Sequence, residues 1–351
     1  MATVGSPAGL EVFDTVTRGD AAPRWVHEGI VRAWGIPAES DVSLIVLSEN
    51  ITFSVSLAAD PTMVVRLGRP GYAQSVDHPR AELQWVEALR ETAGIPTPAP
   101  IRGTDGDLVQ FIHDERGGRW TAVAFEFVAG TVLEDEGADA SRFAEIGRLT
   151  ALLHDHARSW VPPTAFIRFE WDIDDMVGPD ARWGDWRAAS LKRAEVRTLE
   201  RAESKARATL DTLGIRRDTE HFGLIHGDLR PSNVMVMPDG ENPLTIIDFD
   251  DCGFGYYLYD FAAAITFYEH RPAARDMAAG WLDGYRAVNP LTSDDLRAAE
   301  SFVMLRRLTM LGWATTHRSD ALPPDLWDEN LPGTVEVASR YLDDPGWITR
   351  D

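Results

Sequence analysis

Cysteine and lysine are the residue types that this sequence uses least. Cys252 is the only cysteine among 351 residues, which excludes an internal disulfide framework and a zinc site built from thiolates. Lys192 and Lys205 are the only lysines, so no lysine before residue 192 is available to bind phosphate. A single thiol is typical of the reducing cytoplasm, which is the location we expect.

Positive charge and long apolar segments are also scarce. The 34 lysines and arginines face 56 aspartates and glutamates, which gives a formal net charge of −22. That balance disfavours nucleic acids and anionic membranes as partners. No run of about 18 apolar residues and no secretory signal pattern occurs, so we expect a soluble protein. Its length allows a sizeable core and two lobes.

The clearest chemical pattern lies in residues 224–251, LIHGDLRPSNVMVMPDGENPLTIIDFDD. Apolar runs at residues 222–225, 234–237 and 244–247 are typical of short strands, and residues 238–240, PDG, are turn chemistry. The stretch therefore predicts strands joined by a polar loop and a tight turn.

Three oxygen-bearing side chains occupy the loops of this stretch. Asp228 lies in the first loop, Asn233 follows five positions later, and Asp248 follows the last apolar run. Carboxylate and amide oxygens are ligands of the kind that Mg²⁺ prefers. The pattern predicts phosphoryl transfer, in which Asp228 orients a hydroxyl while Asn233 and Asp248 hold Mg²⁺. The alternative is that all three are ordinary turn and cap residues.

The motifs HGD-x-x-x-x-N and IDFD resemble those of the aminoglycoside phosphotransferase (APH-like) family of small-molecule kinases. The segments LIHGDLRPSN, IIDFDDCGFGYYLYDFA and MLRRL are similar to a bacterial branch that includes stress-response kinase A. The resemblance implies an α+β, protein-kinase-like fold with a small N-terminal β-sheet lobe and a larger, mainly helical C-terminal lobe. We place the nucleotide-binding lobe at residues 1–128 and the catalytic and acceptor-binding lobe at residues 129–351.

By this resemblance, the protein transfers the γ-phosphate of ATP, or of GTP, to a hydroxyl of a small molecule such as an antibiotic or a metabolite. One alternative is a protein Ser/Thr kinase of the stress-response type. Another is a nucleotide-binding pseudokinase, which the missing lysine favours and the intact metal ligands oppose.

The resemblance also assigns a phosphate-binding set in the N-terminal lobe. Ser48 and Asn50, between predicted strands, would meet phosphate oxygens, although an ordinary hairpin turn explains them equally well. Arg66 takes the strand position where kinases carry a lysine, and Glu82, in a helix predicted over residues 78–92, would orient it. Arg69 is the other candidate for the position that we give to Arg66. The alternative for Arg66 and Glu82 is that both are ordinary surface charges. At the hinge between the lobes, the backbones of Glu126 and Val128 would bond the purine.

Residues 160–187 interleave tryptophans with aspartates. In the resembled family this region contributes to the acceptor pocket, and aromatic faces beside carboxylates suit a cationic acceptor. The alternative is that the tryptophans pack a helical hairpin and the acids are solvated. The candidate acceptor residues are Trp171, Asp175, Trp183, Trp186 and, in the catalytic loop, Arg230.

Two further features concern support for the loops. Asp260 stands where a helix begins, and we expect it to hold the catalytic loop through backbone N–H groups. Arg306 and Arg307 interrupt the apolar residues 302–311 and need carboxylate partners if they are buried.

Overall fold

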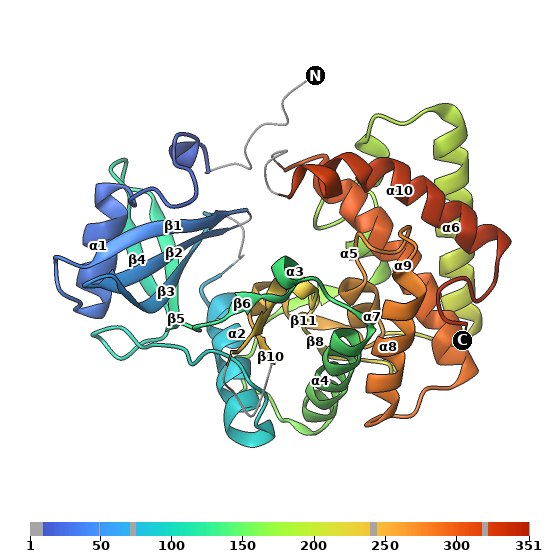
Figure 1. Ribbon diagram of the computed structural model, residues 1–351, viewed down its shortest axis with the longest axis horizontal. Coiled ribbons are helices and arrows are strands. Elements are labelled where there is room, and N and C mark those ends of the chain that lie inside the picture. Colours follow the sequence, from blue (N-terminus) through green and yellow to red (C-terminus); the bar gives the residue numbers. More distant parts are fainter. Residues whose placement is uncertain (1–9, 49, 71–74, 239–243, 318–321, 351) are drawn as a thin grey trace. The chain divides into compact units, whose positions relative to one another are not determined.

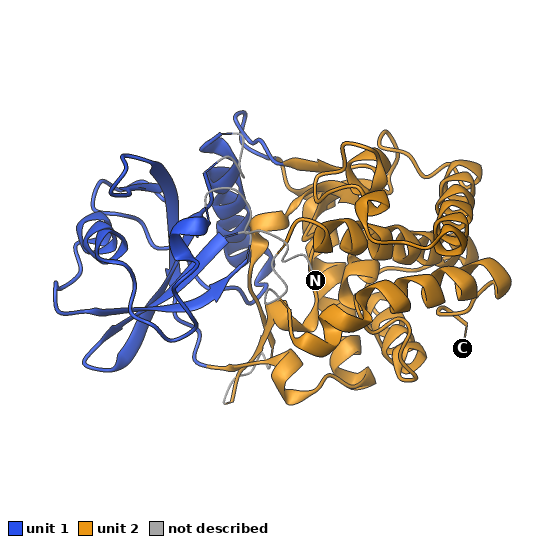
Figure 2. Ribbon diagram, turned by 90° about the horizontal axis from the view of Figure 1, so that it is seen from above, with its two compact units in different colours: residues 1–129, 162–168 blue, residues 130–161, 169–351 orange. Residues whose placement is uncertain are grey.

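The computed structural model describes residues 10–48, 50–70, 75–238, 244–317 and 322–350, and its fold is α+β as expected (Figure 1). The chain divides into two compact units, coloured separately in Figure 2: residues 1–129 with 162–168, and residues 130–161 with 169–351. Residues 162–168, which the sequence analysis places in the second lobe, join the first unit. One tie is the hydrogen bond that Arg168 Nη1 donates to the backbone oxygen of His78 at 2.7 Å.

The first unit is built on a five-stranded antiparallel sheet with the strand order β1-β2-β3-β5-β4. The strands are Asp41–Leu47 (β1), Asn50–Leu57 (β2), Asp60–Gly68 (β3), Gln110–His113 (β4) and Arg119–Glu126 (β5). Since β3 pairs with β5, the chain between β3 and β4 has to leave the sheet, and it does so through a helix.

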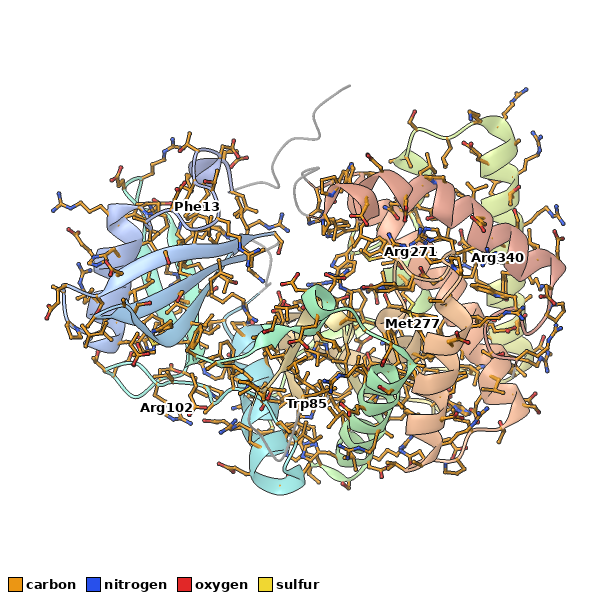
Figure 3. The ribbon with its side chains drawn as sticks, in the orientation of Figure 1. Phe13, Trp85, Arg102, Arg271, Met277 and Arg340 are labelled. Carbon is orange, nitrogen blue, oxygen red and sulfur yellow. The ribbon has the colours of Figure 1, made fainter. Side chains whose placement is uncertain are left out.

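The helices of the first unit are the 3-10 turn η1 (Glu11–Phe13), α1 (Arg24–Trp34), and α2 (Asp77–Ala88), which continues as the π-helical turn η2 (Leu89–Ala93). Helix α1 follows Pro23 and ends at Gly35, whose φ of 64° is left-handed. Phe13, labelled in Figure 3, lies 6.2 Å from Phe53 and 5.7 Å from Trp120 between ring centroids. These rings belong to the buried core of this unit.

The second unit contains two small sheets, with strand orders β10-β9-β6 and β7-β11-β8. Their strands are Thr131–Val132 (β6), Phe169–Trp171 (β7), Phe222–Ile225 (β8), Val234–Val236 (β9), Leu244–Ile246 (β10) and Gly253–Tyr256 (β11). The three strands expected from the apolar runs at residues 222–225, 234–237 and 244–247 are present as β8, β9 and β10. The strands β6, β7 and β11 were not predicted from the sequence.

Helices make up most of the second unit, as the sequence analysis expects. Longer ones are α4 (Ala140–Ser159), α6 (Arg193–Thr212), α8 (Ala274–Arg286), α9 (Ser293–Ala314) and α10 (Pro324–Asp343). Shorter ones are α3 (Leu133–Glu136), α5 (Ile173–Val177), η3 (Trp186–Ala188), η4 (Pro231–Asn233), η5 (Phe249–Asp251) and α7 (Tyr259–Ala264).

Helix α9 is the central helix of the second unit, and residues 298–313 are buried on all sides. It packs against α5, α6, α7 and α10, and α4 runs beside α8 (Figure 1). Within the described ranges, none of the helices combines the length and hydrophobicity that a membrane span requires.

Candidate active site

The catalytic loop joins β8 to β9 in the second unit and holds Asp228 against Asn233. Asn233 Nδ2 donates to Asp228 Oδ2 at 2.9 Å and to the Asp228 backbone oxygen at 2.8 Å. The amide nitrogen of Asn233 therefore binds the loop, and its Oδ1 is the atom that could hold a cation.

Asp248 lies at the same end of the β9–β10 hairpin as Asn233. Val234 pairs with Ile246 at that end, and Ile247 N donates to the Asn233 backbone oxygen at 3.0 Å. The structure thus brings the predicted Asp, Asn and Asp set to one place. Asp248 is exposed and has a φ of 64°. A left-handed conformation at a residue other than glycine costs about 1–3 kcal/mol and is concentrated at functional sites.

At Gly227 the loop approaches the segment after Asp248 closely. Its φ is 82°, and a Cβ there would lie 2.8 Å from the Asp251 backbone oxygen. Trp171 Nε1 donates to the same oxygen at 2.8 Å. The glycine of the HGD motif is therefore needed both for its backbone conformation and for its lack of a side chain.

Asp260, at the start of α7, holds the loop from behind, and this prediction is confirmed. Its Oδ2 accepts from His226 N at 3.0 Å and its Oδ1 from Gly227 N at 2.8 Å. His154 Nε2 lies 3.0 Å from Oδ2, and Tyr285 Oη lies 2.9 Å from His154 Nδ1. Burial lowers the pKa of His154, although Asp260 opposes the shift, so the imidazole is neutral near pH 7.

Arg306 of α9 is the partner of Asp228 that the sequence analysis did not identify. The sequence indicated only that Arg306 needs a carboxylate if buried, and the structure places it fully buried with Nη2 donating to Asp228 Oδ1. Burial by itself lowers the pKa of Arg306, but Tyr259 and the Asp228 carboxylate outweigh it and raise that pKa. Asp228 stays partly accessible, with 18% of its side chain exposed.

The candidate acceptor residues divide into two groups. Trp171 and Trp186 are at most 1% exposed, and Trp186 Nε1 donates to Glu203 Oε2 at 3.0 Å. Asp175 forms a capping box with Asp172 at the start of α5, and burial, followed by the Asp172 charge, raises the pKa of Asp175. These contacts favour the packing interpretation for all three candidates.

Trp183 contacts Arg306, the partner of Asp228, and Arg230 lies beside Asp228 itself. The Trp183 ring is 4.9 Å from the guanidinium carbon of Arg306, although Trp183 is only 6% exposed. Arg230 Nε lies 3.6 Å from Asp228 Oδ2, and its guanidinium carbon is 5.7 Å from the Phe267 ring. Arg230 is therefore the candidate acceptor residue whose side chain lies beside the Asp228 carboxylate.

The predicted Arg66–Glu82 pair is present in the first unit. Arg66 Nη2 donates to both Glu82 oxygens at 2.7 and 2.6 Å, and the two residues are 8% and 1% exposed. This pairing selects Arg66 over Arg69 as the residue that Glu82 orients.

The turn before β2 and the end of β5 carry the other candidate nucleotide groups. Ser48 N donates to the Asn50 backbone oxygen at 3.0 Å, and Asn50 Oδ1 accepts from Arg69 N at 3.4 Å. Glu126 N donates to the Ala99 backbone oxygen at 2.9 Å. The backbone N–H of Glu126 is therefore engaged within the first unit, and its C=O is the group that could accept from a purine.

The donor set around Asn233 and Asp248 fits Mg²⁺ and not a metal bound by protein alone. In the part of the chain that the structure describes, there is no cluster of three or more His, Cys, Asp or Glu side chains that could hold a metal ion. Mg²⁺ commonly takes one or two protein oxygens and completes its shell with phosphate and water. Asn233 and Asp248 could supply those protein oxygens.

Among the known proteins that this chain is similar to are several phosphotransferases and kinases. Residues 45–291 match the profile of the phosphotransferase enzyme family. An uncharacterized Deinococcus radiodurans protein is 30% identical over 240 residues, covering 66% of each chain. Amicoumacin kinase of Bacillus subtilis is 22% identical over 254 residues, covering 68% of this chain and 70% of the relative. The structure of a microcompartment-associated aminopropanol kinase is 32% identical with a TM-score of 0.80, covering 90% of this chain and 96% of the other. The predicted kinase-like α+β fold is therefore confirmed.

Proposed function

This chain belongs to the phosphotransferase enzyme family and is a small-molecule kinase that acts on an alcohol group, and we propose that its acceptor is a short amino alcohol. The likeness to the aminopropanol kinase, which extends over 90% of the chain, carries this choice of acceptor. The net charge of −22 also suits a cationic acceptor, because an acidic protein attracts cations.

Asp228 would receive the proton of the acceptor hydroxyl. As the acceptor oxygen bonds to the γ-phosphorus, the bond from that phosphorus to the β–γ bridging oxygen breaks, and the nucleoside diphosphate leaves. Asp228 suits this role because its carboxylate is held by Asn233 and is still partly exposed. Arg230, 3.6 Å away, would contact the transferred phosphate or the acceptor.

Asn233 Oδ1 and Asp248 would hold Mg²⁺, which neutralises phosphate charge when bound. In the first unit, Arg66, oriented by Glu82, would bind the phosphates of ATP, and Ser48 and Asn50 would assist. Guanidinium suits this replacement of lysine because its planar donors match phosphate oxygens.

We further propose that residues 1–128 form the nucleotide-binding lobe and residues 129–351 the catalytic lobe. The Glu126 C=O and the Val128 N–H would form hydrogen bonds with the base of the nucleotide. We propose ATP as the donor, and GTP is the alternative. Dependence on ATP and the single thiol fit an enzyme of the cytoplasm.

A panel assay tests the acceptor. Purified protein is incubated with ATP, Mg²⁺ and either aminopropanol or propanol, and products are followed by ³¹P NMR. The proposal predicts a phosphomonoester of aminopropanol and at least about tenfold slower transfer to propanol, because one charged contact contributes about 1.5–3 kcal/mol. Equal use of the two alcohols would contradict the amino-alcohol assignment.

The same assay separates the alternatives. Amicoumacin, offered in place of aminopropanol, tests an antibiotic acceptor. Transfer of label only to lysate proteins would identify a protein kinase. Nucleotide binding with no transfer to any acceptor would identify a pseudokinase.

A further inference from the structure

Two adjacent arginines of α9 are both fully buried but reach different partners. Arg307 Nη1 donates to Glu269 Oε2 at 3.2 Å, and its Nη2 donates to the Asn330 backbone oxygen at 2.9 Å. Arg306 instead reaches the catalytic loop and meets Asp228, 78 positions away in sequence. Because a buried cation is costly unless it is well paired, each guanidinium has to be explained by the groups around it.

Every nitrogen of the Arg306 guanidinium has a partner. Nε donates to Thr266 Oγ1 at 3.2 Å, Nη1 to Tyr259 Oη at 3.0 Å and to the Gly227 backbone oxygen at 3.3 Å, and Nη2 to Asp228 Oδ1. The Trp183 and Tyr259 rings lie 4.9 and 5.5 Å from its central carbon. The planar group is thus fixed in position before any substrate binds.

Arg306 and Asn233 hold opposite oxygens of the Asp228 carboxylate. Oδ1 accepts from Arg306 and Oδ2 accepts from Asn233 Nδ2, so rotation of the carboxylate about its Cβ–Cγ bond would break one of the two bonds. A carboxylate offers about four acceptor positions, which leaves capacity for an acceptor hydroxyl.

The backbone of the loop has a support that does not involve Arg306. Asp260 binds the N–H groups of His226 and Gly227, and Asn233 binds the Asp228 backbone oxygen. The loop should therefore keep its path without the guanidinium, while the side chain of Asp228 would lose its alignment.

We propose that Arg306 is a positioning residue, which aligns the Asp228 carboxylate for proton acceptance from the acceptor hydroxyl. This inference rests on the proposed function of Asp228. Arg306 acts through the Asp228 carboxylate, to which it donates, and is assigned no contact with the nucleotide or the acceptor, so its removal should slow the chemical step and leave nucleotide binding intact.

The test compares Arg306→Met with Arg307→Met, a control at an equally buried neighbour whose partner is Glu269. ADP release is measured with aminopropanol, and folding is checked by thermal unfolding. Arg306→Met should lower kcat about 100-fold, the loss expected for a misplacement of about 1 Å, while KM for ATP stays within about threefold. Arg306→Lys and added guanidinium ion should each restore part of the rate, and guanidinium should not affect Arg307→Met.

Tyr259→Phe gives a second measurement if Arg306→Met does not fold. This substitution removes the phenol oxygen that accepts from Arg306 Nη1 but keeps the positive charge of Arg306. It should lower kcat about three- to tenfold, which is the effect of one hydrogen bond. The inference is wrong if kcat stays near wild type in the folded variants, if Arg307→Met loses as much, or if KM changes in place of kcat. An inactive wild-type protein would instead contradict the proposed function.

Discussion

Gly227 shows how a single residue constrains the catalytic loop. We expect Gly227→Ala to lower the free energy of unfolding by about 2–4 kcal/mol, because the left-handed backbone costs about 1–2 kcal/mol for alanine and the new Cβ would press on the Asp251 backbone oxygen. Activity should fall as well, since Asp251 is the last residue of η5, the turn that begins directly after Asp248. Urea unfolding measures the change.

Gly214→Ala is the matched control for this substitution. Gly214 also has a positive φ, 69°, but a Cβ there would meet no atom within 4 Å. Only the conformational cost of about 1–2 kcal/mol should remain. Equal destabilisation by the two substitutions would show that the contact with Asp251 has no cost.

His154 predicts a dependence of stability on pH. Burial lowers its pKa in the folded protein below the ordinary 6.5, so below that pH the unfolded chain binds a proton that the folded protein does not. The free energy of unfolding should therefore fall as the pH decreases from about 6.5, by at most about 1.4 kcal/mol per pH unit for this group, until the folded pKa is reached.

The measurement is urea unfolding between about pH 5 and pH 8. His154→Gln keeps a polar side chain but cannot titrate, so it should show a weaker loss of stability on acidification. The same slope in wild type and His154→Gln would contradict a neutral, buried imidazole.

Some residues of the candidate site could be predicted from the sequence and others could not. The spacing of Asp228, Asn233 and Asp248 was enough to predict that they lie in loops beside short strands, because apolar runs flank the loops that carry them. The link between Arg306 and Asp228 depends on tertiary packing of α9, which no local pattern contains. For Trp171 and Trp186, composition could not distinguish core packing from a pocket, since both require aromatic side chains.

Helix α9 carries one partner of a fully buried ion pair. Arg307 and Glu269 are both fully buried, and burial lowers the pKa of Arg307 and raises the pKa of Glu269. We expect Arg307→Met alone to destabilise the protein by about 3–5 kcal/mol, because Glu269 would be left without its cation.

The double variant Arg307→Met with Glu269→Leu tests this interpretation of α9. Replacing both partners should restore much of the lost stability, since two desolvated charges are replaced by apolar groups. Thermal or urea unfolding of the four proteins gives the coupling energy. A double variant that is as unstable as the sum of the single variants would contradict an ion pair as the cause.

The local pattern of apolar residues decided whether the sequence could predict an element. The long helix α4 and the strands β8, β9 and β10 have clear periodicity or apolar runs. The missed strands β7 and β11 are as short as β8, β9 and β10, but they lack an apolar run: β7 contains Glu170, and β11 contains two glycines. Gly253 is there because the backbone approaches β7 closely: a Cβ would lie 2.5 Å from the Phe169 oxygen. Such a requirement becomes visible only when both strands are placed.

For the whole molecule, the stabilisation that ATP gives should depend on Mg²⁺. ATP at about 100 times its dissociation constant should stabilise the protein by about 2.7 kcal/mol. EDTA should remove most of that gain, because phosphate and protein oxygens share Mg²⁺. AMP is the control, since it lacks the β- and γ-phosphates, and its effect on the melting temperature should not depend on Mg²⁺.

Asn233→Ala with Asp248→Ala should abolish the Mg²⁺-dependent part of the ATP shift. The part that persists in EDTA should remain, because Arg66 and the first unit are unchanged. A full Mg²⁺-dependent shift in this double variant would place the metal elsewhere.

Turnover by Asp228→Asn is the most direct measurement of the proposed chemistry. The variant keeps the size of the side chain but loses the proton-accepting carboxylate, so kcat for aminopropanol should fall about a thousandfold, while the dissociation constant for ATP with Mg²⁺, measured by calorimetry, stays within about threefold. A folded Asp228→Asn protein that retains kcat within about tenfold of wild type would show that this carboxylate does not take part in phosphate transfer.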